Sequence, residues 1–103
     1  MVLFRRQLGD VLRAQRIERG MTLREVSAEA MVSLGYISEI ERGQKEASSE
    51  LLGSLCSALD VSLSSVLREV SHAVAAEERV VAVPTPIPVP SVAVSTVVVA
   101  SAA

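Results

Sequence analysis

Two short helices separated by a tight break are the feature that most constrains this chain. The segment TLREVSAEAMVSLGYISEIERG, residues 22–43, opens with Thr22 and places Glu25 three residues later. This spacing is a capping box, in which each side chain accepts a hydrogen bond from the other residue's backbone N–H. After a break at residues 30–32, Ser33 is a second N-cap residue. The pattern predicts one helix from about Leu23 and a second one directly after Ser33.

Apolar residues recur at helical spacing in three other segments, so the predicted fold is all-α with five helices. The first helix carries Phe4, Leu8, Val11 and Leu12 and ends at Gly20. The fourth begins after Ser48 or Ser49 and carries Leu51, Leu52, Leu55, Cys56 and Leu59. The fifth begins after Ser62. Because nothing before Pro84 stops it, we expect it to extend for about 20 residues, longer than the small core it adjoins.

The composition changes at Pro84, where PTPIPVP has proline at every second position. Proline lacks an amide donor and favours an extended spacer. The following segment, SVAVSTVVVASAA, is 13 residues long, short of the ~20 that a membrane-spanning helix needs. We therefore predict no membrane span. A disordered tail and a tail that adds a strand to a partner both remain open.

Charge is distributed unevenly along the chain. The net charge of the whole sequence is −2, but residues 1–45 carry +2 and residues 46–103 carry −4. Only the first part is suited to binding phosphates. The two aromatic residues, Phe4 and Tyr36, are too few for a platform that stacks single-stranded bases. The lone Cys56 and the absence of a signal-peptide pattern predict a cytoplasmic protein without an intramolecular disulfide.

Chemistry-bearing residues form no catalytic or metal-binding pattern. His72 and Cys56 fall in separate predicted helices, and no His, Cys or Asp cluster has metal-ligand spacing. We therefore expect no enzyme, no metal and no cofactor. Cys56 lies on the apolar stripe of its helix and is predicted to be an inert core thiol.

Two short helices with one helix before them and two after are typical of a helix-turn-helix domain, whose second helix enters the major groove. The run LRAQRIERGMTLREVSAEAMVSLGYISEIERGQKEASSELLGSLCSALDVSLSSVL resembles the Xre/Cro-like bacterial transcriptional regulators across about residues 8–67. The stretches TLREVS and VSLGYISEIERGQKEASSELL are most similar to the Clp gene regulators of actinobacteria. The resemblance implies a lambda-repressor/Cro-like DNA-binding domain over residues 1–67 and a dimerisation helix over 63–83. The composition after Pro84 adds a flexible Pro/Val-rich tail over 84–103.

The resemblance also implies roles for single residues. It pairs Arg16 with Glu41 in a structural ion pair between the first and third helices. The base-reading positions it implies are Leu34, Gly35, Ser38 and Glu39. Leu34 can contact a thymine methyl, Ser38 can donate or accept a hydrogen bond, and Glu39 can accept one from a cytosine amino group. A solvated glutamate on an exposed face is the alternative for Glu39.

Glycine inside a helix costs ~1 kcal/mol relative to alanine, so we interpret Gly35 as a point where the backbone approaches a base or sugar closely. Affinity must come from flanking residues, because Leu34–Glu41 contains no cation. The predicted phosphate contacts are Thr22, Arg24, Ser33, Tyr36, Arg42, Gln44 and Lys45. For Tyr36 the alternative is packing on the second helix. Arg5, Arg6, Arg13 and Arg19 are interpreted as solvated helix-face residues in preference to phosphate ligands.

Three positions depart from the family pattern. Leu23 stands where a glutamine often reaches a phosphate, Met31 where a glycine often adopts the left-handed conformation, and Ala47 where a proline often precedes the fourth helix. Met31 either stores ~1–2 kcal/mol of strain or marks a different turn.

A recognition helix of two turns buries little surface, so regulators of this kind usually dimerise with two such helices one DNA turn apart, roughly 34 Å. The fifth helix has apolar residues to spare for a homodimer contact: Leu63, Val66, Val70, Ala73 and Val74. Two-fold symmetry predicts a palindromic operator in double-stranded DNA.

The resemblance further implies an activator of Clp protease and stress genes that is itself degraded by Clp protease. Ala102 and Ala103 then belong to a degradation signal, or to an expendable end. A protein-interaction adaptor or antitoxin-like partner is the alternative function.

Overall fold

The computed structural model describes residues 3–82, which form five α-helices and no strand. The helices are α1 Phe4–Glu18, α2 Leu23–Ala30, α3 Leu34–Glu41, α4 Ser49–Ala58 and α5 Leu63–Ala82. The predicted all-α fold is therefore confirmed, including the length of the fifth helix. The Pro/Val-rich tail, with Ala102 and Ala103, lies outside the described residues.

Side-chain caps set the helix starts that were predicted. Thr22 Oγ1 accepts from the Glu25 N–H at 3.1 Å, and Glu25 Oε1 accepts from the Thr22 N–H at 2.8 Å. This is the reciprocal capping box at the start of α2. The Ser33 hydroxyl accepts a hydrogen bond from the Tyr36 N–H at the start of α3. The Ser48 hydroxyl accepts one from the Leu51 N–H at the start of α4. Each cap satisfies a backbone donor that the helix itself leaves free.

Left-handed residues end the helices. Gly20 follows α1 with φ 68°, and Gly43 follows α3 with φ 75°. Glycine adopts this conformation at no steric cost, whereas Met31 at the end of α2 adopts it with φ 60°. The Met31 side chain is 88% exposed, so no packing compensates for the unfavourable backbone. Of the two alternatives for this position, the structure therefore has the strained one.

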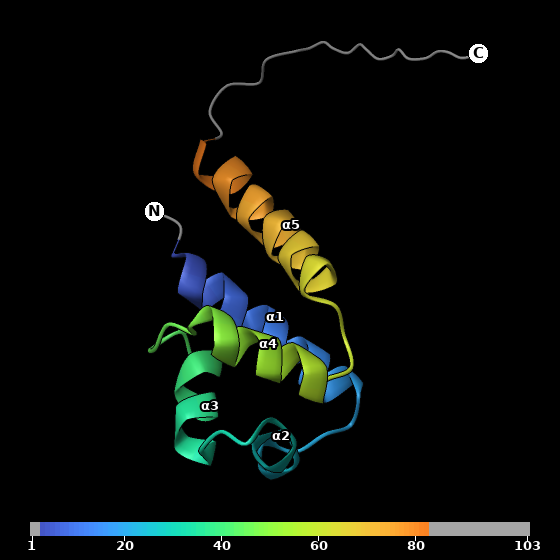
Figure 1. Ribbon diagram of the computed structural model, residues 1–103. Coiled ribbons are helices and arrows are strands. Elements are labelled where there is room, and N and C mark those ends of the chain that lie inside the picture. Colours follow the sequence, from blue (N-terminus) through green and yellow to red (C-terminus); the bar gives the residue numbers. More distant parts are fainter. Residues whose placement is uncertain (1–2, 83–103) are drawn as a thin grey trace, which may run out of the picture.

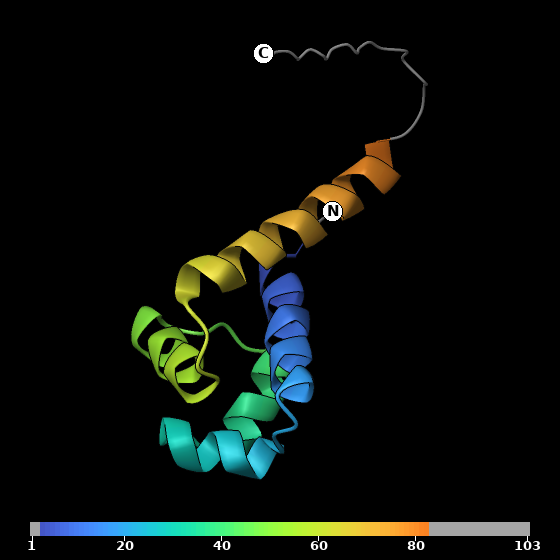
Figure 2. The same ribbon diagram turned by 90° about the vertical axis from the view of Figure 1, so that its right-hand side faces the viewer.

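Helix α1 is the centre of the arrangement (Figure 1). It packs against α5 on one side and α3 on the other, while α2 packs on α3 and α4. In the view turned by 90°, α2 again lies at one end of the molecule and α5 at the other (Figure 2). The core consists of Leu8, Val11, Leu12, Val26, Ala30, Ile37, Ile40, Leu55, Cys56, Leu59, Val66 and Val70.

The assignment of Val66 and Val70 to the dimer contact needs correction. Both are covered within the chain's own core, at 0% and 3% exposure, and a buried side chain has no free surface to offer a partner. Leu63 and Leu67 on the same helix are exposed, and Ala73 and Val74 are partly buried.

Among the described helices, none alone has the length and apolar content of a membrane span; α4 and α5 together reach them only as a pair bent by 103°.

Candidate DNA interface

Helix α3 has one face locked into the core and one face open. Ile37 and Ile40 are fully buried, which fixes the rotation of the helix about its axis. On the outer side, Leu34 is 38% exposed and Gly35 is exposed. A Cβ added to Gly35 would meet no atom within 4 Å, so the fold does not itself require glycine there. Ser38 and Glu39, one turn further along, are partly exposed, and the four predicted base-reading residues thus share a continuous, accessible part of α3.

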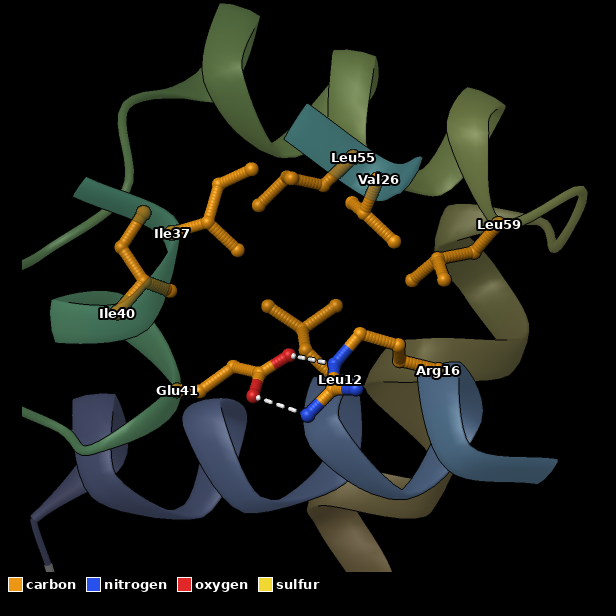
Figure 3. A pocket seen from close by; sticks show the side chains of 8 residues that line it. All are labelled: Leu12, Arg16, Val26, Ile37, Ile40, Glu41, Leu55 and Leu59. Carbon is orange, nitrogen blue, oxygen red and sulfur yellow. Dashed lines mark hydrogen bonds and ion pairs between the residues drawn. The ribbon is translucent and has the colours of Figure 1, made fainter. Parts of the chain in front are cut away.

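Arg16 and Glu41 form a bidentate ion pair between α1 and α3 (Figure 3). Arg16 Nε donates to Glu41 Oε2 at 2.7 Å, and its Nη2 donates to Oε1 at 3.0 Å. A third guanidinium N–H donates to the Met21 carbonyl at 3.0 Å, which connects the pair to the start of α2. The hydrogen bond with Glu41 raises the pKa of Arg16 above its usual value, although burial opposes the shift. Because its charge is neutralised inside the protein, Glu41 adds no repulsion toward DNA.

Gly9 sets how closely α1 approaches α3, and sequence reasoning missed it. A Cβ built on Gly9 would lie 2.3 Å from the Ile40 carbonyl oxygen and 2.8 Å from that of Glu41. The two helix backbones therefore touch directly at this position. A glycine within an otherwise regular helical segment was the available signal, since such a residue often marks a close backbone approach.

The predicted phosphate contacts are only partly brought together. Arg42 donates to the Ser38 hydroxyl and, at 3.3 Å, to Gln44 Oε1, so these three side chains form one cluster. The Tyr36 hydroxyl instead donates to the Glu46 carbonyl at 3.3 Å, and its partly buried ring packs against the core. The structure therefore engages Tyr36 within the chain, where we had predicted a phosphate contact.

Three other predicted phosphate ligands lie on exposed surface at the edges of the motif. They are Thr22 and Arg24 at the start of α2 and Lys45 after α3. Within residues 3–82 the ion pairs closer than 4.0 Å are Arg5–Glu46 and Arg16–Glu41, so Arg24 and Lys45 have no acidic partner there.

The interior beside the ion pair offers no room for a small-molecule ligand. The cavity drawn in Figure 3 has a volume of about 10 Å³ and is lined mostly by aliphatic side chains, among them Leu12, Val26 and Leu55. One water molecule is about the largest group that such a volume accepts. In the part of the chain that the structure describes, no three His, Cys, Asp or Glu side chains are grouped as metal ligands would be.

Known proteins with this arrangement define its class. The family model described as helix-turn-helix matches residues 12–66, and the chain belongs to this family of DNA-binding transcriptional regulators. The transcriptional regulator ClgR of Mycobacterium tuberculosis is 57% identical over 77 residues, which cover 75% of this chain and 69% of that protein. The solved structure of the clp gene regulator ClgR from Corynebacterium glutamicum is 47% identical, with a TM-score of 0.71 over 78% of this chain and 88% of that one. Within the helix-turn-helix class, the chain is thus a member of the Clp gene regulator family.

A more distant relative is similar over a shorter stretch of the chain. The HTH-type transcriptional regulator DdrOP3 of Deinococcus deserti is 36% identical over 64 residues, which cover 62% of this chain and 50% of that protein. All three relatives are transcriptional regulators.

Proposed function

We propose that this chain binds a palindromic operator in double-stranded DNA as a homodimer and activates genes for Clp proteolysis and related stress functions. The observation that carries the proposal is the open face of α3, held in place by a buried face and by the Arg16–Glu41 pair. The choice of target genes rests on the similarity to the clp gene regulator ClgR.

In this proposal, Leu34, Gly35, Ser38 and Glu39 meet base edges, and the surrounding cations meet phosphates. Glu39 is the specificity residue, because a carboxylate can accept from the cytosine amino group but repels the DNA backbone. Thr22, Arg24, Ser33, Arg42, Gln44 and Lys45 supply the phosphate contacts. Arg42 is well suited to this role, since Ser38 and Gln44 hold its guanidinium beside the reading face.

The dimer contact is proposed on the exposed side of α5. Leu63 and Leu67 lie one turn apart and are both exposed in the single chain. Ala73 and Val74 extend this apolar strip toward the end of the helix, where each keeps part of its surface accessible. A two-fold operator requires that a second copy covering the strip leave both α3 helices on one face of the assembly.

Selection of bound fragments from genomic DNA tests the function. We expect recovery of fragments with a common palindrome, located upstream of Clp protease genes. On the selected duplex, Glu39→Ala should lose the preference for one cytosine per half-site while non-specific affinity is retained or increased. Glu78→Ala, on the exposed surface of α5, makes the same change away from α3 and should keep the preference. A chain that binds no duplex, or binds with no dependence on salt, would contradict DNA binding and favour the adaptor function.

A further inference from the structure

A groove of about 670 Å³ lies beside the reading face, between α1, the start of α2 and the end of α3. Ser38, Arg42 and Gln44 line it from the α3 side, so the groove is continuous with the proposed DNA-binding surface. Arg6, Asp10 and Arg13 line it from the α1 side. The Arg16–Glu41 pair forms part of the inner wall, where the two charges cancel.

The α1 side of this groove is a single stripe of one helix face. Residues 6, 10 and 13 follow each other at intervals of four and three, the spacing that stacks side chains on one side of an α-helix. All three side chains are exposed. Neither Arg6 nor Arg13 lies within 4.0 Å of a carboxylate in residues 3–82, where the ion pairs are those of Arg5 and Arg16.

The charge of the groove therefore favours an anion. Arg6, Arg13 and Arg42 contribute three cations that no close carboxylate neutralises, against the single carboxylate of Asp10. From the α2 side the groove receives Leu23, whose side chain cannot bind a phosphate. The positive charge that attracts a phosphate into this groove must consequently come from α1 and from Arg42.

We propose that Arg6 and Arg13 bind backbone phosphates of the same DNA duplex whose bases α3 reads, which makes α1 a second phosphate-binding element. This inference rests on the proposed function. Asp10, between the two arginines, weakens the contact by repelling the phosphates. The groove thus adds affinity without adding a base contact, and it extends the protected DNA beyond the base pairs under α3.

Salt titrations of duplex binding with Arg6→Gln, Arg13→Gln and the double variant test the proposal. Glutamine keeps the β- and γ-carbons of Arg6 that pack beside Gly43, so the fold is retained, as thermal unfolding will verify. The slope of log K against log salt should become shallower by roughly 0.9 for each phosphate that the variant no longer neutralises, once for every bound protomer. Base preference should not change, and Asp10→Asn should increase affinity.

Arg68→Gln is the matched control, because it removes the same charge from the exposed surface of α5. This helix contributes no residue to the groove and lies at the other end of the molecule from α2 (Figures 1 and 2). Sedimentation will verify that each variant keeps the oligomeric state of the wild type. Slopes for the α1 variants that equal the Arg68→Gln slope would overturn the α1 contact while the proposed function stands. An altered base preference at unchanged slope would also overturn it. A wild-type chain that shows no salt-dependent duplex binding would refute the proposed function, and the α1 contact with it.

Discussion

Replacing Gly9 by alanine places a methyl group where the backbones of α1 and α3 touch. The new Cβ would lie 2.3 Å from the Ile40 carbonyl oxygen, and ordinary contact begins at 3.4 Å. Because both neighbouring atoms belong to the backbone of α3, no side-chain rotation can relieve the clash. The two helices must move apart by about 1 Å, so Glu41 on α3 moves away from Arg16 on α1.

Overpacking of this kind costs about 1–3 kcal/mol. Because the clash is with backbone atoms, the cost lies in the upper part of that range, about 2–3 kcal/mol. Alanine returns up to about 1 kcal/mol through its higher helix propensity. The expected net loss in the free energy of unfolding is therefore about 1–2 kcal/mol, which lowers the Tm of a domain this small by roughly 5–15 °C. Circular dichroism during urea and thermal unfolding measures both quantities.

Gly53→Ala is the control for this prediction. Gly53 lies inside α4, and an added Cβ there meets no atom within 4 Å, so the same substitution should stabilise the chain by up to about 1 kcal/mol. If Gly9→Ala matched Gly53→Ala, direct backbone contact would not set the spacing of α1 and α3. DNA affinity should fall for Gly9→Ala and stay unchanged for Gly53→Ala, because only the first substitution displaces α3, which carries the proposed reading residues.

Four further outcomes are expected. Gly35→Ala should raise unfolding stability by up to about 1 kcal/mol yet weaken binding of the selected duplex; unchanged binding would contradict close approach to DNA. Met31→Gly should stabilise the chain by about 1 kcal/mol in urea titrations, since glycine removes the left-handed strain. Arg16→Gln should cost about 3 kcal/mol of unfolding free energy by leaving the Glu41 carboxylate buried without its partner; a cost below about 1 kcal/mol would refute a structural role. Burial raises the pKa of the Cys56 thiol, so iodoacetamide at pH 8 should alkylate the folded chain far more slowly than the urea-unfolded one, as mass spectrometry will report. The associated stability is complete below the thiol's unfolded pKa and is lost as pH rises through the folded pKa.

Local signals carried most of the fold prediction. The Thr22–Glu25 capping box and the Ser33 cap depend on residues three positions apart, so the short helices of the motif can be predicted from sequence alone. The length of α5 was predictable for a similar reason, since no residue between Leu63 and Ala82 disrupts a helix. The Arg16–Glu41 pair joins distant segments, and only the family resemblance pointed to it.

The remaining features depend on how whole helices meet. Nothing near Gly9 in the sequence shows that the carbonyl of Ile40 will lie against it. The same holds for Val66 and Val70, because the apolar residues of α5 outnumber those the core can cover, and periodicity does not tell which of them the core takes. The Tyr36 hydroxyl was likewise assigned to a phosphate, since its acceptor, the Glu46 carbonyl, depends on the path of a loop.

Three separate contacts join α1 to the last turn of α3 and the loop after it. Arg5 Nε donates to the Gly43 carbonyl at 3.0 Å, Gly9 lies against Ile40, and Arg16 holds Glu41. All of them act on the inner side of α3 or beyond its end, and none involves the side chains of its outer face. Substitutions on that outer face can therefore accumulate without loosening the helix. A chain built in this way can evolve toward a new target sequence while α1 and α3 keep their placement relative to each other.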